Sequence, residues 1–95
     1  MGIVANNSFR FNYSMDLYLL KDFTVTDLLN SWSRIYEYAS VEENEDDVYF
    51  LADCLDVLFE KTKRLSEADR KTVMGKAKAD VEAISIGENV LKLAG

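Results

Sequence analysis

The scarcity of helix-breaking residues is the feature that most constrains what this chain can fold into. Its 95 residues include no proline, and the four glycines stand at positions 2, 75, 87 and 95. Because proline and glycine are the residues that most often interrupt helices, we expect long helices joined by short polar turns. Apolar residues make up 48% of the chain, which is enough for one hydrophobic core. We therefore predict a single all-α domain over residues 1–95, a compact bundle of about four helices with either a short fifth helix or a frayed tail at the C-terminus.

Apolar residues at helical spacing place the first long helix from about Thr26 to Tyr38. Thr24, followed three residues later by Asp27, resembles a capping box, but Thr26 is an equally good N-cap. Trp32 stands in the middle of the apolar stripe. We interpret it as a core anchor.

Two further helices follow. One runs from roughly Glu45 to Lys63 and is apolar over well over half of its circumference, so we place it at the centre of the bundle. The other opens with Ser66 as its N-cap and extends to about Ile84, and we expect Gly75 within it to permit close packing. Three large side chains should be buried together, namely Trp32, Leu55 and Phe59.

The N-terminal segment fits two patterns. Apolar and polar residues alternate from position 8 to 15, which is typical of a strand, whereas Ser14 is also a suitable cap for a short helix. A lone strand would have no partner in the rest of the chain. We therefore predict a helix from about Ser14 to Asp22, preceded by an extended arm.

Charge is concentrated in one part of the chain. Residues 41–60 contain eight acidic side chains and no basic one, although the whole chain carries a net charge of only −6 and has a pI of about 4.5. This balance argues against binding to the phosphate backbone of nucleic acids, which requires clustered lysine and arginine. A concentrated negative field instead favours the approach of a basic protein partner, or it serves solubility alone.

Part of this acidic zone lies on a single helical face. Four polar residues between positions 49 and 60 follow one another at spacings of 4, 3 and 4, so their side chains share one side of the helix. Tyr49 belongs to this stripe, and we expect it to be exposed as a contact residue for a partner. The candidate partner-binding residues are Glu42, Glu43, Glu45, Asp46, Asp47, Tyr49, Asp53, Asp56 and Glu60.

No residue pattern points to catalysis, to a cofactor or to a metal. The chain has no histidine, which is the commonest general base and metal ligand, and no glycine-rich phosphate loop. The segment from Glu42 to Asp53 lacks the alternating ligands and the glycine of an EF-hand. We predict that the protein is not an enzyme, has no cofactor and uses neither nucleic acid nor a small molecule as a direct ligand.

The cellular compartment is expected to be the cytoplasm. The single cysteine, Cys54, has no partner for an internal disulfide and stands in an apolar run, so we interpret it as an inert packed thiol. No apolar run approaches the roughly 18 residues that a membrane helix requires, and residues 1–15 lack the features of a signal peptide.

The order of these signals also resembles a known class of proteins. A short helix ending in Leu20-Lys21-Asp22-Phe23 precedes the sequence Thr-Val-Thr-Asp-Leu-Leu at 24–29, and an aromatic helix, an acidic loop and a leucine-rich helix follow. Over roughly residues 17–84 this is similar to the small acidic helical immunity proteins of bacterial toxin systems, notably those of the colicin D type and of contact-dependent growth inhibition. The resemblance implies a stoichiometric inhibitor that binds a basic nuclease toxin and blocks its active site with carboxylates that mimic the RNA backbone.

Two other functions fit the same sequence features. One is a phage-encoded anti-defence protein that acts as a nucleic-acid charge mimic. The other is a non-catalytic adaptor subunit whose acidity only confers solubility. The neighbouring genes distinguish an immunity protein from an anti-defence protein, since a toxin gene is expected beside the first and a phage operon around the second. Salt-sensitive binding to basic proteins distinguishes both from an adaptor.

Overall fold

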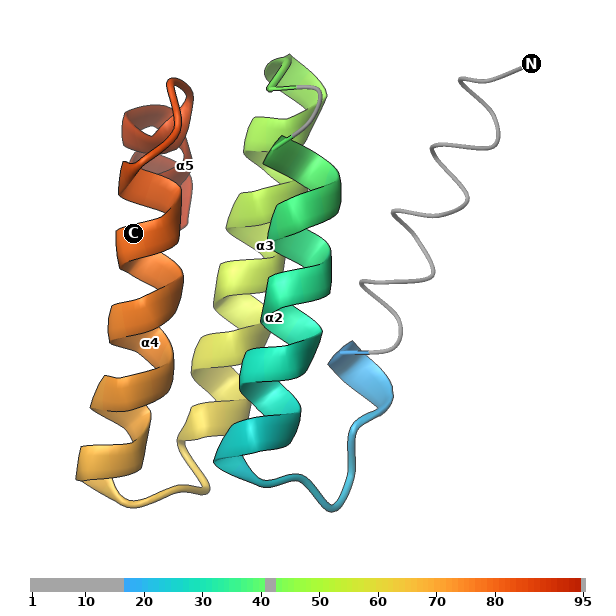
Figure 1. Ribbon diagram of the computed structural model, residues 1–95, viewed down its shortest axis with the longest axis vertical. Helices are drawn as coiled ribbons and strands as arrows, with labels where there is room; N and C mark the ends of the chain where they lie inside the picture. The colour runs from blue at the N-terminus through green and yellow to red at the C-terminus, as the bar shows by residue number, and fades with distance from the viewer. Residues whose placement is uncertain (1–16, 41–42, 95) are drawn as a thin grey trace.

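The chain forms a bundle of helices without β-structure in its described part. The structure is a computed structural model that describes residues 17–40 and 43–94 (Figure 1). One helical turn at 17–19 precedes four helices, and no strand occurs among the described residues, which confirms the prediction of an all-α fold. The helices are α2 (Val25–Ser40), α3 (Glu45–Thr62), α4 (Glu67–Glu82) and α5 (Gly87–Ala94).

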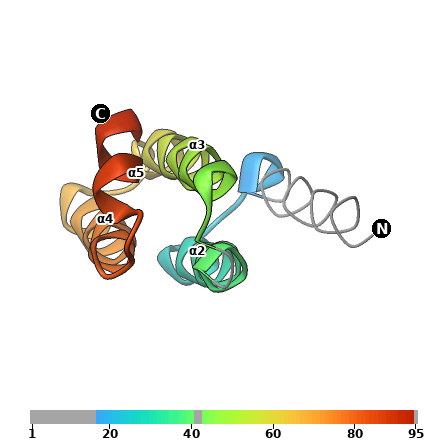
Figure 2. The same ribbon diagram turned by 90° about the horizontal axis from the view of Figure 1, so that it is seen from above.

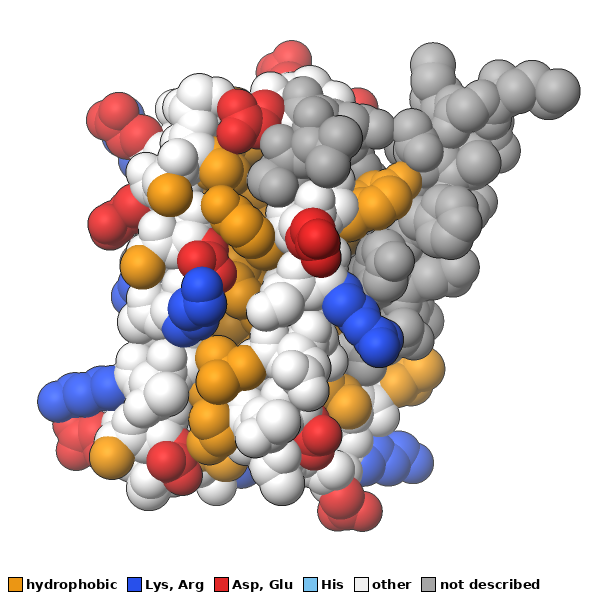
Figure 3. All heavy atoms as spheres, in the orientation of Figure 1, with side chains coloured by type: hydrophobic (Ala, Val, Ile, Leu, Met, Phe, Trp, Pro, Cys, Tyr) orange, Lys and Arg blue, Asp and Glu red, His pale blue; other side chains and the backbone are white. Residues whose placement is uncertain are grey.

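Helix α3 is the centre of the arrangement, as its nearly all-round apolar surface predicted. It packs against α2, α4 and α5, whereas α2 and α5 do not contact each other. Seen along the helices, α2 and α5 lie on opposite sides of the pair formed by α3 and α4 (Figure 2). On the side that carries α2, apolar side chains fill the seam between α2 and α4, with acidic and basic side chains around it (Figure 3).

The starts of the helices follow the capping signals in the sequence. At α2, the Thr24 N–H donates to Asp27 Oδ2 at 2.8 Å and the Asp27 N–H donates to Thr24 Oγ1 at 3.2 Å, so the reciprocal box forms around Thr24 and not Thr26. At α4, the Ser66 side chain accepts from the Asp69 N–H at 3.2 Å. These bonds satisfy backbone donors that have no partner within the helix.

The core is organised around Trp32, which is fully buried. Its indole Nε1 donates to Asp80 Oδ2 at 3.0 Å, and the other carboxylate oxygen of Asp80 accepts from Lys76 Nζ at 2.8 Å. A buried tryptophan normally requires such an acceptor, and here α4 supplies it to α2. The other buried apolar residues are Leu17, Leu28, Ile35, Ala39, Val48, Leu51, Ala52, Cys54, Leu55, Val57, Leu58, Val73, Ala77, Val81 and Val90.

Two predictions about packing were wrong. Phe59 is 39% exposed and not part of the buried cluster with Trp32 and Leu55, because it lies at the edge of α3 between two basic side chains. Gly75 is exposed, and a Cβ added to it would meet nothing within 4 Å, so close packing does not explain this glycine.

The N-terminal helix ends earlier than predicted. Of the described residues before α2, only 17–19 are helical, and the chain from Leu20 to Thr24 is a connection to α2. The physical reason is a contact from α3, since Lys61 Nζ donates to the carbonyl oxygens of Tyr18 at 2.8 Å and of Leu20 at 2.5 Å. These carbonyls therefore bond a side chain of another helix and do not continue their own helix. The predicted extended arm and the start of the predicted helix at Ser14 lie outside the described residues.

Candidate protein-binding surface

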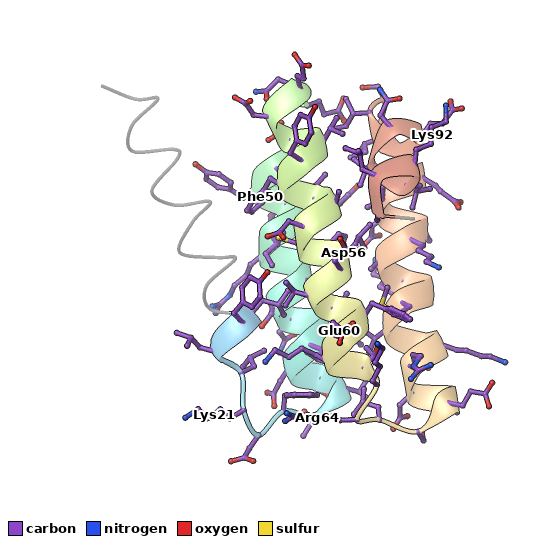
Figure 4. The ribbon with its side chains drawn as sticks, turned by 180° about the vertical axis from the view of Figure 1, so that it is seen from behind. Lys21, Phe50, Asp56, Glu60, Arg64 and Lys92 are labelled. Atoms are coloured by element: carbon purple, nitrogen blue, oxygen red, sulfur yellow. The ribbon has the colours of Figure 1, made fainter. Side chains whose placement is uncertain are left out.

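The outward face of α3 carries the predicted stripe of polar residues. Tyr49, Asp53, Asp56 and Glu60 are all exposed, and Tyr49 is 61% exposed, as expected. Asp56 and Glu60 point away from the bundle on the face opposite to that of Figure 1 (Figure 4). Since α3 is fixed by contacts on its other sides, this stripe is held on a rigid support.

The acidic residues at the start of α3 divide into two groups. Glu45 and Asp46 are exposed in the first turn, where carboxylates also interact favourably with the positive end of the helix dipole. Asp47 is fully buried, so its prediction as a partner-binding residue needs correction. Its Oδ2 accepts from the Asn44 N–H at 2.9 Å, while Asn44 Oδ1 accepts from the Asp46 and Asp47 amides, so Asp47 completes the capping box in which Asn44 is the N-cap of α3.

The acidic residues before α3 differ in their settings. Glu43 is half-buried and its Oε2 accepts from the Ser85 hydroxyl at 2.6 Å, which ties the α2–α3 loop to the α4–α5 turn. Its φ of 41° lies in the left-handed region, where residues other than glycine are uncommon. This carboxylate has a structural contact and stands apart from the α3 stripe. Glu42 lies outside the described residues.

Tyr18 adds to this surface from a distant part of the sequence. Its side chain is 50% exposed, and its phenol lies near the carboxylates of Asp53 and Asp56. Partial burial, followed by the negative charge of Asp53, raises the pKa of the Tyr18 phenol above its usual value of 10.0. Tyr18 also lines a hollow of about 270 Å³ with Asp56, Glu60 and Arg64.

Lys61 holds this tyrosine in place. Besides its bonds to the two carbonyls of the 17–20 segment, its ammonium lies 5.6 Å from the centroid of the Phe23 ring. Burial, and to a smaller degree the nearby Arg64 charge, lowers the pKa of Lys61 from its usual value. Its charge is thus used within the fold, whereas the Lys63 ammonium pairs with Glu60 of the stripe at 3.0 Å.

The Tyr49 end of the stripe has an apolar neighbour. Leu93 of α5 is 52% exposed and lines a hollow of about 310 Å³ together with Tyr49, Val48 and Lys92. Exposed apolar side chains therefore flank the row of carboxylates, with Tyr18 alongside it and with Tyr49 and Leu93 beyond its Asp53 end. This combination of apolar contact area and charged groups is typical of protein interfaces.

The sequence could not reveal this neighbourhood. Tyr18 and Leu93 are each more than 30 residues from the parts of α3 that they flank. The one local signal was Leu93 itself, an apolar residue on the exposed side of an otherwise amphipathic helix. Tyr18 offered none, because its role depends on the contact between the 17–19 turn and α3.

The described residues offer no group of three or more histidine, cysteine, aspartate or glutamate side chains that could hold a metal ion. Within the same residues, no helix combines the length and the apolar character that crossing a membrane requires.

Comparison with known proteins gives no relative that would assign a function. No protein-family model matches the chain, and neither does a curated protein or a solved structure.

Proposed function

We propose that this protein is a stoichiometric inhibitor of the immunity type, which binds a basic nuclease toxin of bacteria and covers its active site. The observation that carries the proposal is the exposed row of Asp53, Asp56 and Glu60 on the central helix, flanked by the exposed side chains of Tyr18, Tyr49 and Leu93. A nuclease active site binds a polyanion, so a rigid row of carboxylates is complementary to its lysines and arginines.

Binding would proceed in two steps. The concentrated negative charge of residues 43–60 increases the rate of encounter with a basic partner, and this effect weakens as salt screens the charges. Tyr49, Tyr18 and Leu93 then bury apolar area around the ion pairs and slow dissociation. The protein does no chemistry in this function, because it acts by occupying the site that the nucleic acid would use.

The test uses the nuclease domain encoded next to this chain in its genome, which for an immunity protein is the expected toxin. The variant is Asp56→Lys/Glu60→Lys, and the matched control is Asp22→Lys/Glu67→Lys, which changes the charge equally at two exposed residues away from the surface. Exposed charge changes alter stability by about 0.5 kcal/mol or less, whereas breaking interfacial charge pairs costs about 2–5 kcal/mol of binding. We expect the first variant to lose inhibition of nuclease cleavage and the control to keep it.

Association rates measured between about 50 and 300 mM salt complete the test. The rate for the unmodified protein should fall steeply over this range. A neighbouring gene without nuclease activity, equal inhibition by both variants or a flat salt dependence would each contradict the proposal.

A further inference from the structure

A second surface lies beside the acidic stripe and differs from it in character. Among the described helices, α2 covers the pair of α3 and α4 along its length on one side, whereas on the other side α5 alone packs against the pair. Helix α3 has 18 residues and α5 has 8, so at 1.5 Å per residue α3 is about 15 Å longer than α5. Part of the α3–α4 pair is therefore not covered by α5. Figure 4 shows α5 over one end of α4, with the other end of the pair uncovered on this side.

The uncovered part is a groove of about 530 Å³ with an apolar floor. Leu55 and Phe59 come from α3, Met74 comes from α4, and Leu91 and Ala94 of α5 close one end. The valley between α3 and α4 already accommodates α5 as a packed helix, so the same valley has the width that a second helix needs.

The charge of the groove's α4 wall indicates what kind of helix would bind there. The α4 wall carries three basic residues, Arg70, Lys71 and Lys78, and one acidic residue, Glu82, while Asp56 is the one carboxylate that α3 contributes to the lining. The Arg70 guanidinium lies 5.6 Å from the centroid of the Phe59 ring, and its buried Nε donates to no acceptor within the described part of the chain. A partly desolvated cation of this kind gains most from a carboxylate brought by a partner.

We propose that this groove binds an amphipathic helix of a partner protein, about ten residues long, with apolar residues against Phe59 and Met74 and carboxylates over the α4 wall. The groove borders the α3 stripe, which is suited to a basic partner, and the two surfaces share Asp56 at their edge. Its occupant therefore differs in charge from the proposed toxin, and one site can fail without the other.

The probe is a fluorescein-labelled peptide of about 15 residues, with leucines on one helical face and glutamates on both flanks. A second peptide has lysines in place of the glutamates, and a third has the first composition in scrambled order. The net charge of −6 favours the lysine peptide at long range, so preference for the glutamate peptide can arise only from local contacts. Anisotropy gives the affinities, and amide shifts in ¹⁵N NMR spectra locate the bound peptide.

We expect the glutamate peptide to bind best and to shift the amides of Phe59, Met74 and Lys78. Lys78→Glu should weaken it by about tenfold, whereas Lys21→Glu, the same change at an exposed residue outside the groove, should have little effect. The proposal is overturned if the glutamate peptide binds no better than the scrambled one, if its shifts map elsewhere, or if both variants bind it equally.

Discussion

At the scale of single residues, two glycines show how the same residue type can serve opposite purposes. Gly75 is exposed in the middle of α4 with open space around it. Gly87 is buried at the start of α5, and a Cβ there would overlap the carbonyl group of Val81. Gly75 therefore only weakens its helix, whereas Gly87 permits the close approach of α5 to the end of α4.

We predict that Gly75→Ala stabilises the protein by up to about 1 kcal/mol, since alanine loses less backbone entropy in a helix. Gly87→Ala should destabilise it by about 1–3 kcal/mol, because backbone must shift to admit the new methyl group. Urea denaturation followed by far-UV circular dichroism measures both changes. Midpoints that move in the same direction would contradict this interpretation of the two sites.

At the scale of the helix, α3 depends on how it begins. Its apolar surface makes it central, but the first turn contains three acidic residues, one of them buried. The capping box between Asn44 and Asp47 resolves this conflict, since the buried carboxylate accepts a backbone N–H and the asparagine side chain accepts two more. The cap also fixes the register of the helix, and hence the direction in which its exposed carboxylates point.

We predict that Asn44→Ala lowers the free energy of unfolding by about 1 kcal/mol, the usual effect of losing such a cap. The matched control is Asn30→Ala, which removes the same side chain from an exposed position within α2. There alanine is the better helix former, so the control should be neutral or slightly stabilising. Thermal and urea denaturation compare the two, and an equal loss in both variants would count against the role of the cap.

At the scale of the whole molecule, α3 joins the other helices into one packing unit. Leu55 is 2% exposed on this central helix, whereas Leu93 is 52% exposed on α5. The distribution of charge over the surface is also a property of the whole molecule, because the acidic surface of α3 lies beside a groove with a basic wall. One small bundle thereby presents an acidic surface and a groove with basic side chains next to each other.

We predict that Leu55→Ala costs about 2–5 kcal/mol of stability, because it removes a buried side chain and leaves a cavity. Leu93→Ala, the same substitution on the surface, should cost about 0.5 kcal/mol or less. Unfolding is measured by Trp32 fluorescence and by circular dichroism, which should give the same midpoint if the bundle unfolds as one unit. An unchanged midpoint for Leu55→Ala would contradict its place in the core.

The sequence by itself determined the helical class, the positions of the three long helices to within a few residues, and the exposed side of α3. These are local properties, set by apolar spacing, by capping residues and by the lack of proline. The same local information predicted that Tyr49 would be exposed, and the structure confirms it.

Only the tertiary structure decided the rest, because it depends on contacts between residues far apart in the chain. Asp47 looked like one more surface carboxylate, and packing made it a buried cap. Phe59 fitted the apolar stripe of α3, but α5 is too short to cover it, so its ring borders an open groove. Tyr18 reached the acidic stripe because Lys61 bonds the carbonyls around it, a contact that spans more than 40 residues and leaves no trace in local periodicity.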